Sequence, residues 1–208
     1  MEKSKKQVLS KTVQTRRSPD SVFVEIPHSA KLELLNKNSL TIFHLNISNN
    51  KFSYTELFDL LKDNLGTYVL SRHEYNENPL RAISKAISKL KDIEDNGDKG
   101  AGGELGELLL YLFLEHYLGA PKLLSKVELK TTANQYVFNA DGIHLFNFND
   151  DGNINYQVLV CESKLNGKFE DAINSAFDSI KSSQENSQFE IRLVNAELFK
   201  ETFSMQDA

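Results

Sequence analysis

Residues 139–165 read NADGIHLFNFNDDGNINYQVLVCESKL, two apolar stretches joined by a polar turn. The Asp-Gly pair in the middle of NDDGN, flanked by alternating apolar residues, predicts a β-hairpin. Three charged residues interrupt the apolar pattern at the outer ends of this hairpin: Asp141, Glu162 and Lys164. A charged group in such a place costs free energy unless a partner compensates it. What compensates these three charges therefore bears on both the fold and the function.

The register of the hairpin follows from the length of its loop. A loop of two or four residues centred on the Asp-Gly pair makes the numbers of paired residues sum to 303. Asp141 then lies directly opposite Glu162, and Ile143 lies opposite Val160, so apolar residues face each other on one side. A loop with an odd number of residues would shift every pair by one position and weaken this arrangement.

Two opposed carboxylates need a counter-ion. The Cβ atoms of directly opposed residues in an antiparallel pair are about 4.5–5.5 Å apart, and like charges there are destabilising. Because side chains alternate along a strand, Lys164 lies on the same face as Glu162 and can neutralise one carboxylate. A divalent cation such as Mg²⁺, which binds carboxylate oxygens, would neutralise both.

A further source of acid lies upstream, in GELGELLLYLFLE at residues 103–115. Glu104 and Glu107 fall in the first turn of a helix expected over residues 104–118, which is apolar nearly all round and is therefore expected to be buried. They are three residues apart and point roughly the same way. If this helix packs on the sheet, one of the two acids can reach Asp141 and Glu162.

Each of these features also has a simpler explanation. Acids in a first helical turn complement the helix dipole. Asp141-Gly142 is typical of a bulge or a strand end, and Glu162 with Lys164 is typical of an exposed ion pair. The combination favours a functional site, because it needs the right element order, a register that opposes the acids, and a lysine of matching parity.

The composition is ordinary for a soluble globular protein: 208 residues, 40% hydrophobic and 25% charged, with a net charge of −5. No global basic field therefore indicates nucleic-acid binding. Residues 1–20 hold six basic and two acidic side chains, a net +4, which leaves −9 for the remainder. The single cysteine, Cys161, excludes an internal disulfide and favours a cytoplasmic protein. The longest apolar run, residues 108–114, is too short to span a membrane.

The chain is expected to have three parts: a flexible basic arm at 1–20, an N-terminal α+β elaboration at 21–97, and a core at 98–208. The break NGDKGAGG at 96–103 marks the boundary of the core. The elaboration is expected to hold strands at 21–26 and 40–47, a helix that begins at Ser53, and a helix over 79–95. After helix 104–118, the core is expected to continue with strands at 122–132, 136–148 and 155–164, a helix at 169–184 and a strand at 189–194. The order is α-β-β-β-α-β, an α/β fold.

Other kinds of site find no support in the sequence. The five histidines show no zinc-ligand spacing with one another or with the cysteine. The glycines of 97–103 lack the P-loop pattern, and no G-x-S-x-G is present. Cys161 and Glu162 are adjacent and are expected to point to opposite faces of the strand, so Cys161 is expected to be a small buried hydrophobe rather than a nucleophile. His144 is expected on the face opposite Asp141, in a structural role.

An α-β-β-β-α-β core that carries Glu, then Asp, then Glu-x-Lys resembles the PD-(D/E)XK nuclease superfamily, whose restriction-endonuclease-like fold is built on a mixed sheet. In this sequence the signature falls on Glu107, Asp141 and Glu162-Ser163-Lys164. Ala140 stands where the superfamily usually has proline, a common departure. The phrases GELGELLLYLFLE, NADGIHLF and VLVCESKL also resemble HamA proteins of the Hachiman anti-phage defence system. The resemblance covers roughly residues 100–195.

The resemblance implies a metal-dependent DNA nuclease that a HamB-like helicase subunit restrains. Asp141, Glu162 and Glu107 would hold Mg²⁺ or Mn²⁺, with the carbonyl of Cys161 as a further ligand, and Lys164 would orient a water or stabilise charge on the phosphate. Glu107 is favoured over Glu104 because the spacing from Gly103 to Glu107 resembles the first helix of related nucleases. DNA would be bound largely without sequence preference, through phosphate contacts from Lys126, Lys130, Lys168 and the basic arm.

Two other functions remain open from the sequence. A catalytically inactive member of the fold would bind DNA or the helicase partner, and it would tolerate replacement of the acids by alanine. A different metal-dependent phosphohydrolase would hydrolyse free nucleotides and leave plasmid DNA intact.

Overall fold

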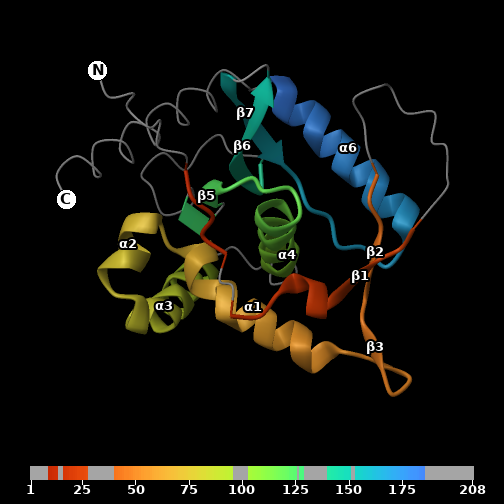
Figure 1. The fold of residues 1–208 in the computed structure, drawn as a ribbon, viewed down its shortest axis with the longest axis horizontal. Helices are drawn as coiled ribbons and strands as arrows, with labels where there is room; N and C mark the ends of the chain where they lie inside the picture. Colours follow the sequence, from red (N-terminus) through yellow and green to blue (C-terminus); the bar gives the residue numbers. More distant parts are fainter. Residues whose placement is uncertain are drawn as a thin grey trace. The chain divides into compact units, whose positions relative to one another are not determined.

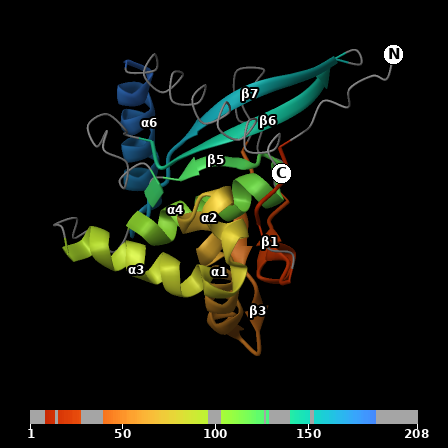
Figure 2. The same cartoon turned by 90° about the vertical axis from the view of Figure 1, so that its left-hand side faces the viewer.

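The predicted hairpin is present in the structure, a computed structural model, as strands β6 (Gly142–Asp150) and β7 (Asn153–Cys161). Their antiparallel ladder runs from Gly142↔Cys161 to Asp150↔Asn153 (Figure 1), so the predicted register is confirmed. Strand β5 (Lys122–Ser125) pairs antiparallel with β6, and the sheet has the order β5-β6-β7 (Figure 2). The ladder ends one position before Asp141 and Glu162, which therefore lie just beyond the paired strands.

The structure describes residues 9–13, 16–27, 40–95, 103–125, 127–128, 140–150 and 153–185. The chain forms two compact units, Gln14–Asn64 and Met1–Val13 with Leu65–Ala208. The core boundary predicted at 97–98, most of the break at 96–103, and the last predicted strand at 189–194 lie outside the described residues. Every strand pair in the described residues is antiparallel, so a mixed sheet would need a strand from elsewhere in the chain.

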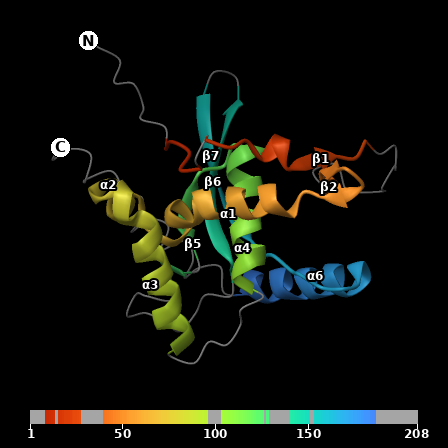
Figure 3. The same ribbon diagram turned by 90° about the horizontal axis from the view of Figure 1, so that it is seen from below.

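Helix α4 (Gly103–His116) is the central helix of the larger unit. It contacts β5 and β6 and lies against the sheet (Figure 3). Its buried stripe is Gly106, Glu107, Leu108, Tyr111, Leu112 and Glu115, which follows the helical period. The helix is not buried all round, because Leu105 is exposed to 41%. Two acids thus lie on the same buried stripe as the apolar residues, and each needs its own compensation.

Other helices described in this unit are α2 (Arg72–Glu77), α3 (Ala82–Asp95) and α6 (Phe169–Glu185), with a short 3₁₀ turn η2 (Pro79–Arg81) before α3. Helix α2 was not predicted. It begins with a capping box, in which Ser71 and Glu74 each bind the other's backbone N–H. The predicted helix over 79–95 is present, although its first turn is 3₁₀ rather than α-helical.

The strand predicted over 122–132 is too long. Strand β5 ends at Ser125, and Val127 and Glu128 are helical. A second capping box explains the change, since the Ser125 N–H donates to Glu128 Oε2 at 2.8 Å and the Glu128 N–H donates to Ser125 Oγ at 3.3 Å. The spacing Ser-x-x-Glu ends the strand by starting a helical turn.

The smaller unit contains two pairs of short strands and the first part of α1 (Tyr54–Val69). Strand β1 (Phe23–Glu25) pairs with β2 (Phe43–Leu45), and β3 (Ile47–Ser48) pairs with β4 (Lys51–Phe52). A 3₁₀ turn, η1 (Pro19–Ser21), precedes β1. The single strand predicted at 40–47 is divided into β2 and β3. Asn49 and Asn50 have φ of 51° and 59°, which makes the tight turn between β3 and β4.

The buried carboxylate of Glu115 holds residues from both segments of its unit, 1–13 and 65–208. It accepts hydrogen bonds from the Thr12 N–H at 2.5 Å, the Val13 N–H at 2.6 Å and the Lys122 N–H at 2.7 Å. The Thr12 hydroxyl also donates to it at 2.7 Å. Residues 9–13 were predicted to belong to a free arm, and this stretch is instead anchored, because the buried carboxylate needs donors.

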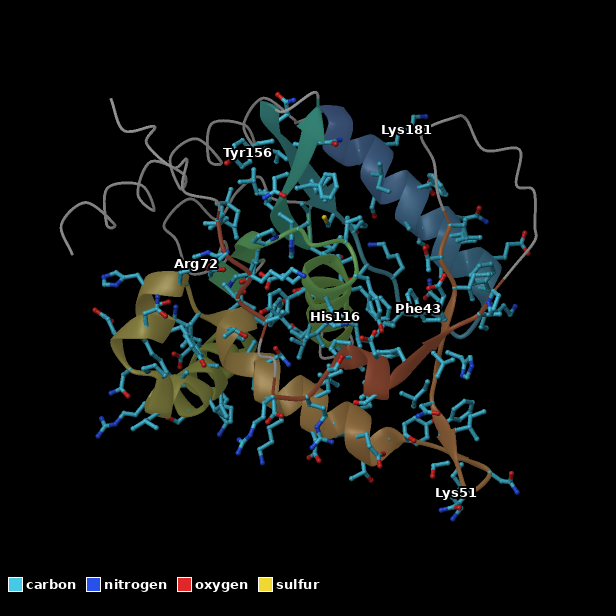
Figure 4. The ribbon with its side chains drawn as sticks, viewed as in Figure 1. Phe43, Lys51, Arg72, His116, Tyr156 and Lys181 are labelled. Atoms are coloured by element: carbon cyan, nitrogen blue, oxygen red, sulfur yellow. The ribbon has the colours of Figure 1, made fainter. Side chains whose placement is uncertain are left out.

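Lys122 is a buried lysine, exposed to only 1%, that ties three segments together. Its Nζ donates to the carbonyls of Tyr68 at 2.9 Å and Leu70 at 2.8 Å, and to Glu128 Oε2 at 2.8 Å. The carbonyls belong to the C-terminal end of α1, where a cation is favourable. Arg72 adds a link from α2, since its Nη2 donates to the Lys122 carbonyl at 2.8 Å (Figure 4).

We expect Glu115→Gln to lower the free energy of unfolding by about 2–4 kcal/mol. One carboxylate oxygen would become an amide NH₂ group, which cannot accept hydrogen bonds, so some of the buried donors would lose their acceptor. Urea-induced unfolding measures the change. The control is Glu170→Gln, the same substitution at an exposed position on α6. An unfolding midpoint of Glu115→Gln that matches the control would contradict the anchoring role.

Candidate functional site

Glu107 and Asp141, two of the predicted site residues, line the same pocket. Glu107 comes from the first turns of α4 and Asp141 from the residue before β6, and each is exposed to only 5%. The other residues that line the pocket are Tyr68, Leu110, Tyr111, Lys122, Leu124, Ser125, Gly142 and His144. Two buried carboxylates from distant parts of the sequence therefore line one pocket, and its lining includes Glu107 but not Glu104.

Asp141 is held by the segment that follows β7. The Ser163 N–H donates to Asp141 Oδ2 at 2.7 Å, and the Ser163 hydroxyl donates to the same oxygen at 2.9 Å. The Asp141 N–H donates in turn to the Cys161 carbonyl at 2.9 Å. Ser163, the middle residue of Glu-Ser-Lys, thus fixes the orientation of the Asp141 carboxylate. Its position in the alternation of side chains did not predict this role.

Glu162 and Lys164 form an ion pair, in which Lys164 Nζ contacts Glu162 Oε1. The two residues were expected to share one face of a strand over 155–164, but β7 ends at Cys161 and they meet in the segment that follows it. The pair is not the exposed one of the simpler explanation, since the Glu162 side chain is 6% exposed and that of Lys164 is 28% exposed. Neither residue lines the pocket of Glu107 and Asp141. In this arrangement Lys164 compensates the charge of Glu162.

Tyr68, from the last turns of α1, contacts Glu107 directly. Its hydroxyl donates to Glu107 Oε2 at 2.7 Å. Burial raises the pKa of Tyr68 well above 10.0, and the charges of Glu107, Asp141 and Glu104 raise it further. The hydroxyl therefore keeps its proton and remains a donor. Nothing in the sequence near Tyr68 indicated this role, because the contact joins residues 39 positions apart.

The close approach of α4 to the segment after β7 depends on Gly106. A Cβ atom at this position would lie 3.1 Å from Ser163 Oγ and 3.2 Å from Leu165 Cγ. Contacts this short require the neighbours to move. The absence of a side chain therefore lets the helix that carries Glu107 pack directly on the residue that orients Asp141.

The chemistry of these residues fits a hard divalent cation. Carboxylate oxygens are the ligands that Mg²⁺ binds in proteins. Glu104 Oε2 is buried and has no hydrogen-bond partner, and the charge of Glu104, like those of Glu107 and Asp141, acts on Tyr68. Among the described residues, however, no three His, Cys, Asp or Glu side chains are placed to hold one ion together. A site with Glu162 as a third ligand would require Glu162 to leave Lys164.

His144 and Cys161 are buried beside this site. His144 was predicted to lie on the face opposite Asp141, but both residues line the same pocket. The prediction fails because Asp141 precedes the ladder, so the alternation of side chains along β6 does not include it. The imidazole is held at Nδ1 by the Ala120 carbonyl at 2.8 Å, which agrees with a structural role. Burial, with a smaller contribution from the charge of Asp141, raises the pKa of Cys161 to about 12. Its thiol is therefore a poor nucleophile, as predicted.

This protein of mixed α and β structure thus brings Glu107 and Asp141 to one buried pocket. The ion pair of Glu162 with Lys164 lies directly after the last strand of the same antiparallel hairpin. Comparison with protein families matches residues 20–208 to HamA. The chain therefore belongs to the HamA family, and it is a protein associated with the Hachiman anti-phage defence system. No curated protein and no solved structure matched the chain. No helix in the described residues is long and apolar enough to cross a membrane.

His144 is expected to make stability depend on pH. Burial lowers the pKa of His144 from 6.5 to about 4, and Lys122 and Arg72 act in the same direction against the Ala120 carbonyl and Glu115. The unfolded chain therefore binds a proton before the folded chain does, and stability falls as the pH falls from 6.5 towards 4.

The loss attributable to His144 is roughly 1–3 kcal/mol over this range. Unfolding free energies of wild type and His144→Asn, measured from pH 7 to pH 4, report it, and the variant should show the smaller slope. His73→Asn, at an exposed position on α2, should keep the wild-type slope. Equal slopes for wild type and His144→Asn would contradict the prediction.

Gly106→Val should lower the free energy of unfolding by about 1–3 kcal/mol, because the new side chain overlaps Ser163 and Leu165. The matched control is Gly167→Val, since a Cβ at Gly167 meets no atom within 4 Å. Thermal unfolding compares the two variants. A melting temperature of Gly106→Val at or above that of the control would show that the packing is not tight there.

Proposed function

We propose that this chain is a metal-dependent DNA nuclease with little sequence preference, acting as the effector subunit of a Hachiman system under the control of a partner helicase. The observation that carries the proposal is the burial of Glu107 and Asp141 against one pocket, with Ser163 of Glu-Ser-Lys bonded to Asp141. Burial of two like charges costs free energy that a bound cation would recover. Glu107 and Asp141 are two of the positions at which the sequence resembles the PD-(D/E)XK signature, and Ser163 lies between the other two, Glu162 and Lys164.

The order of elements supports a PD-(D/E)XK core. Helix α4 is followed by β5, β6 and β7 and then by α6, which agrees with the first five elements of α-β-β-β-α-β. Glu107 lies on α4 as expected, while Asp141 and Glu162, expected on the second and third core strands, lie directly before β6 and directly after β7. The sixth element, expected at 189–194, lies outside the described residues.

In the proposed mechanism, Asp141, Glu107 and Glu162 would hold Mg²⁺ or Mn²⁺. When bound, such an ion polarises a phosphodiester oxygen and lowers the pKa of a bound water. Ser163 fixes the Asp141 carboxylate through two hydrogen bonds, and Tyr68 fixes Glu107 through one. Lys164, once released from Glu162, would stabilise the charge that develops on the phosphate.

DNA would be bound mainly through its phosphates. Lys168 is exposed at the start of α6, while Lys126 and Lys130, the other predicted contacts, lie outside the described residues. The net charge of −5 gives no overall electrostatic attraction for DNA, so the isolated chain is expected to bind it weakly. A subunit that binds DNA weakly on its own is well suited to delivery by a helicase partner, which supports the Hachiman arrangement.

One observation favours a second candidate function, a catalytically inactive subunit that binds DNA or the helicase. Lys164 is paired with Glu162, and the described residues hold no three-ligand cluster. A chain that never leaves this arrangement would bind without cleaving. The two functions differ in one measurable way, because only the nuclease loses its function when the acids are replaced.

The deciding assay is plasmid cleavage by the full chain with Mg²⁺, Mn²⁺ or EDTA, alone and with its helicase partner. We expect cleavage in metal and none in EDTA, and a loss of about 100-fold or more in Glu162→Ala/Lys164→Ala. The matched control, Glu170→Ala/Lys181→Ala, removes one acid and one lysine at exposed positions on α6 and should cleave at the wild-type rate.

Three outcomes would contradict the proposal. Absence of cleavage by wild type even with the partner would favour the inactive subunit. Equal cleavage by wild type and Glu162→Ala/Lys164→Ala would place the chemistry elsewhere. Hydrolysis of free nucleotides with intact plasmid would indicate the phosphohydrolase.

A further inference from the structure

Tyr68 comes from a part of the chain that sequence analysis placed outside the core. Its residue number falls within 21–97, the predicted elaboration, yet it belongs to the same compact unit as the pocket. Its side chain is buried and reaches Glu107 Oε2 at 2.7 Å. The pocket is therefore built partly from the last turns of α1.

Both ends of Tyr68 are fixed. Its backbone carbonyl accepts from Lys122 Nζ at 2.9 Å, and Lys122 is itself held by Glu128. Its ring packs on that of Tyr111, with the ring centroids 5.8 Å apart. Because the backbone and the ring of Tyr68 are both held, its hydroxyl can fix the carboxylate that accepts its hydrogen bond.

We propose that Tyr68 is a positioning residue of the site, whose hydroxyl holds the Glu107 carboxylate in the orientation that binds the divalent cation. This inference rests on the proposed function, because it assigns Glu107 to the metal. It extends that function by making the end of α1 a part of the active site. Groups that orient a metal ligand typically contribute about 10- to 100-fold to metal affinity.

The test is the affinity of the full chain for Mn²⁺ alone, measured by the electron paramagnetic resonance signal of the free ion. Tyr68→Phe, which keeps the ring and removes the hydroxyl, should bind Mn²⁺ about tenfold more weakly than wild type. The matched control is Tyr75→Phe, the same substitution at a half-buried position on α2, and it should bind as wild type does.

A double-mutant cycle separates positioning from a general structural effect. In a Glu107→Gln background, Tyr68→Phe should change Mn²⁺ affinity by less than about twofold, because the group it orients is already altered. A tenfold loss in both backgrounds, or no loss in either, would overturn the inference. If wild type neither binds Mn²⁺ nor cleaves plasmid, the proposed function fails; if it does both and Tyr68→Phe equals it, this inference alone fails.

A measurement that keeps the tyrosine hydroxyl covers the case in which Tyr68→Phe does not fold. 3-Fluorotyrosine placed at position 68 reports on its hydroxyl through ¹⁹F NMR, and the same label at position 75 is the control. Addition of Mg²⁺ should shift the resonance at position 68 and leave that at position 75 in place. An unchanged resonance at position 68 in a chain that binds Mg²⁺ would overturn the inference.

Discussion

The antiparallel pairing of β6 with β7 determines where the charged residues of the site can lie. Because the ladder closes at Gly142↔Cys161, Asp141 and Glu162 are the first residues beyond it on each strand. The end of the ladder therefore places these two residues near each other. The alternation of side chains between the two faces of a paired strand does not apply to them. A shift of one residue in this register would turn the apolar side chains of both strands to the opposite face.

Each buried charge in the larger unit is compensated in its own way. Glu115 accepts four hydrogen bonds, three of them from backbone groups. Lys122 is surrounded by two carbonyls and one carboxylate. Glu107 accepts a hydrogen bond from the hydroxyl of Tyr68, and Glu104 keeps a buried oxygen without a hydrogen-bond partner. Glu115 and Lys122 hold the fold through their hydrogen bonds, whereas the unpartnered oxygen of Glu104 suits a ligand.

Sequence reasoning identified what local patterns determine. The Asp-Gly turn gave the register, and the spacing of apolar residues gave α4 and α6 within two residues of their bounds. Two capping boxes, Ser71 to Glu74 and Ser125 to Glu128, were readable from their spacing and were overlooked. The burial of Lys122 could not be predicted, because its partners at Tyr68 and Leu70 lie more than 50 positions away. The contact of Tyr68 with Glu107 depends in the same way on tertiary packing.

The burial of Cys161 has a consequence for the chemistry that this protein can tolerate. It is the single thiol in the chain, and it lies at the end of β7 directly before Glu162. Since the thiolate is the form that oxidants and alkylating agents attack, a pKa of about 12 leaves the native sulfur almost unreactive at neutral pH. The folded protein should therefore withstand oxidative stress at this position, and a cysteine introduced on its surface would be the one that maleimide reagents label.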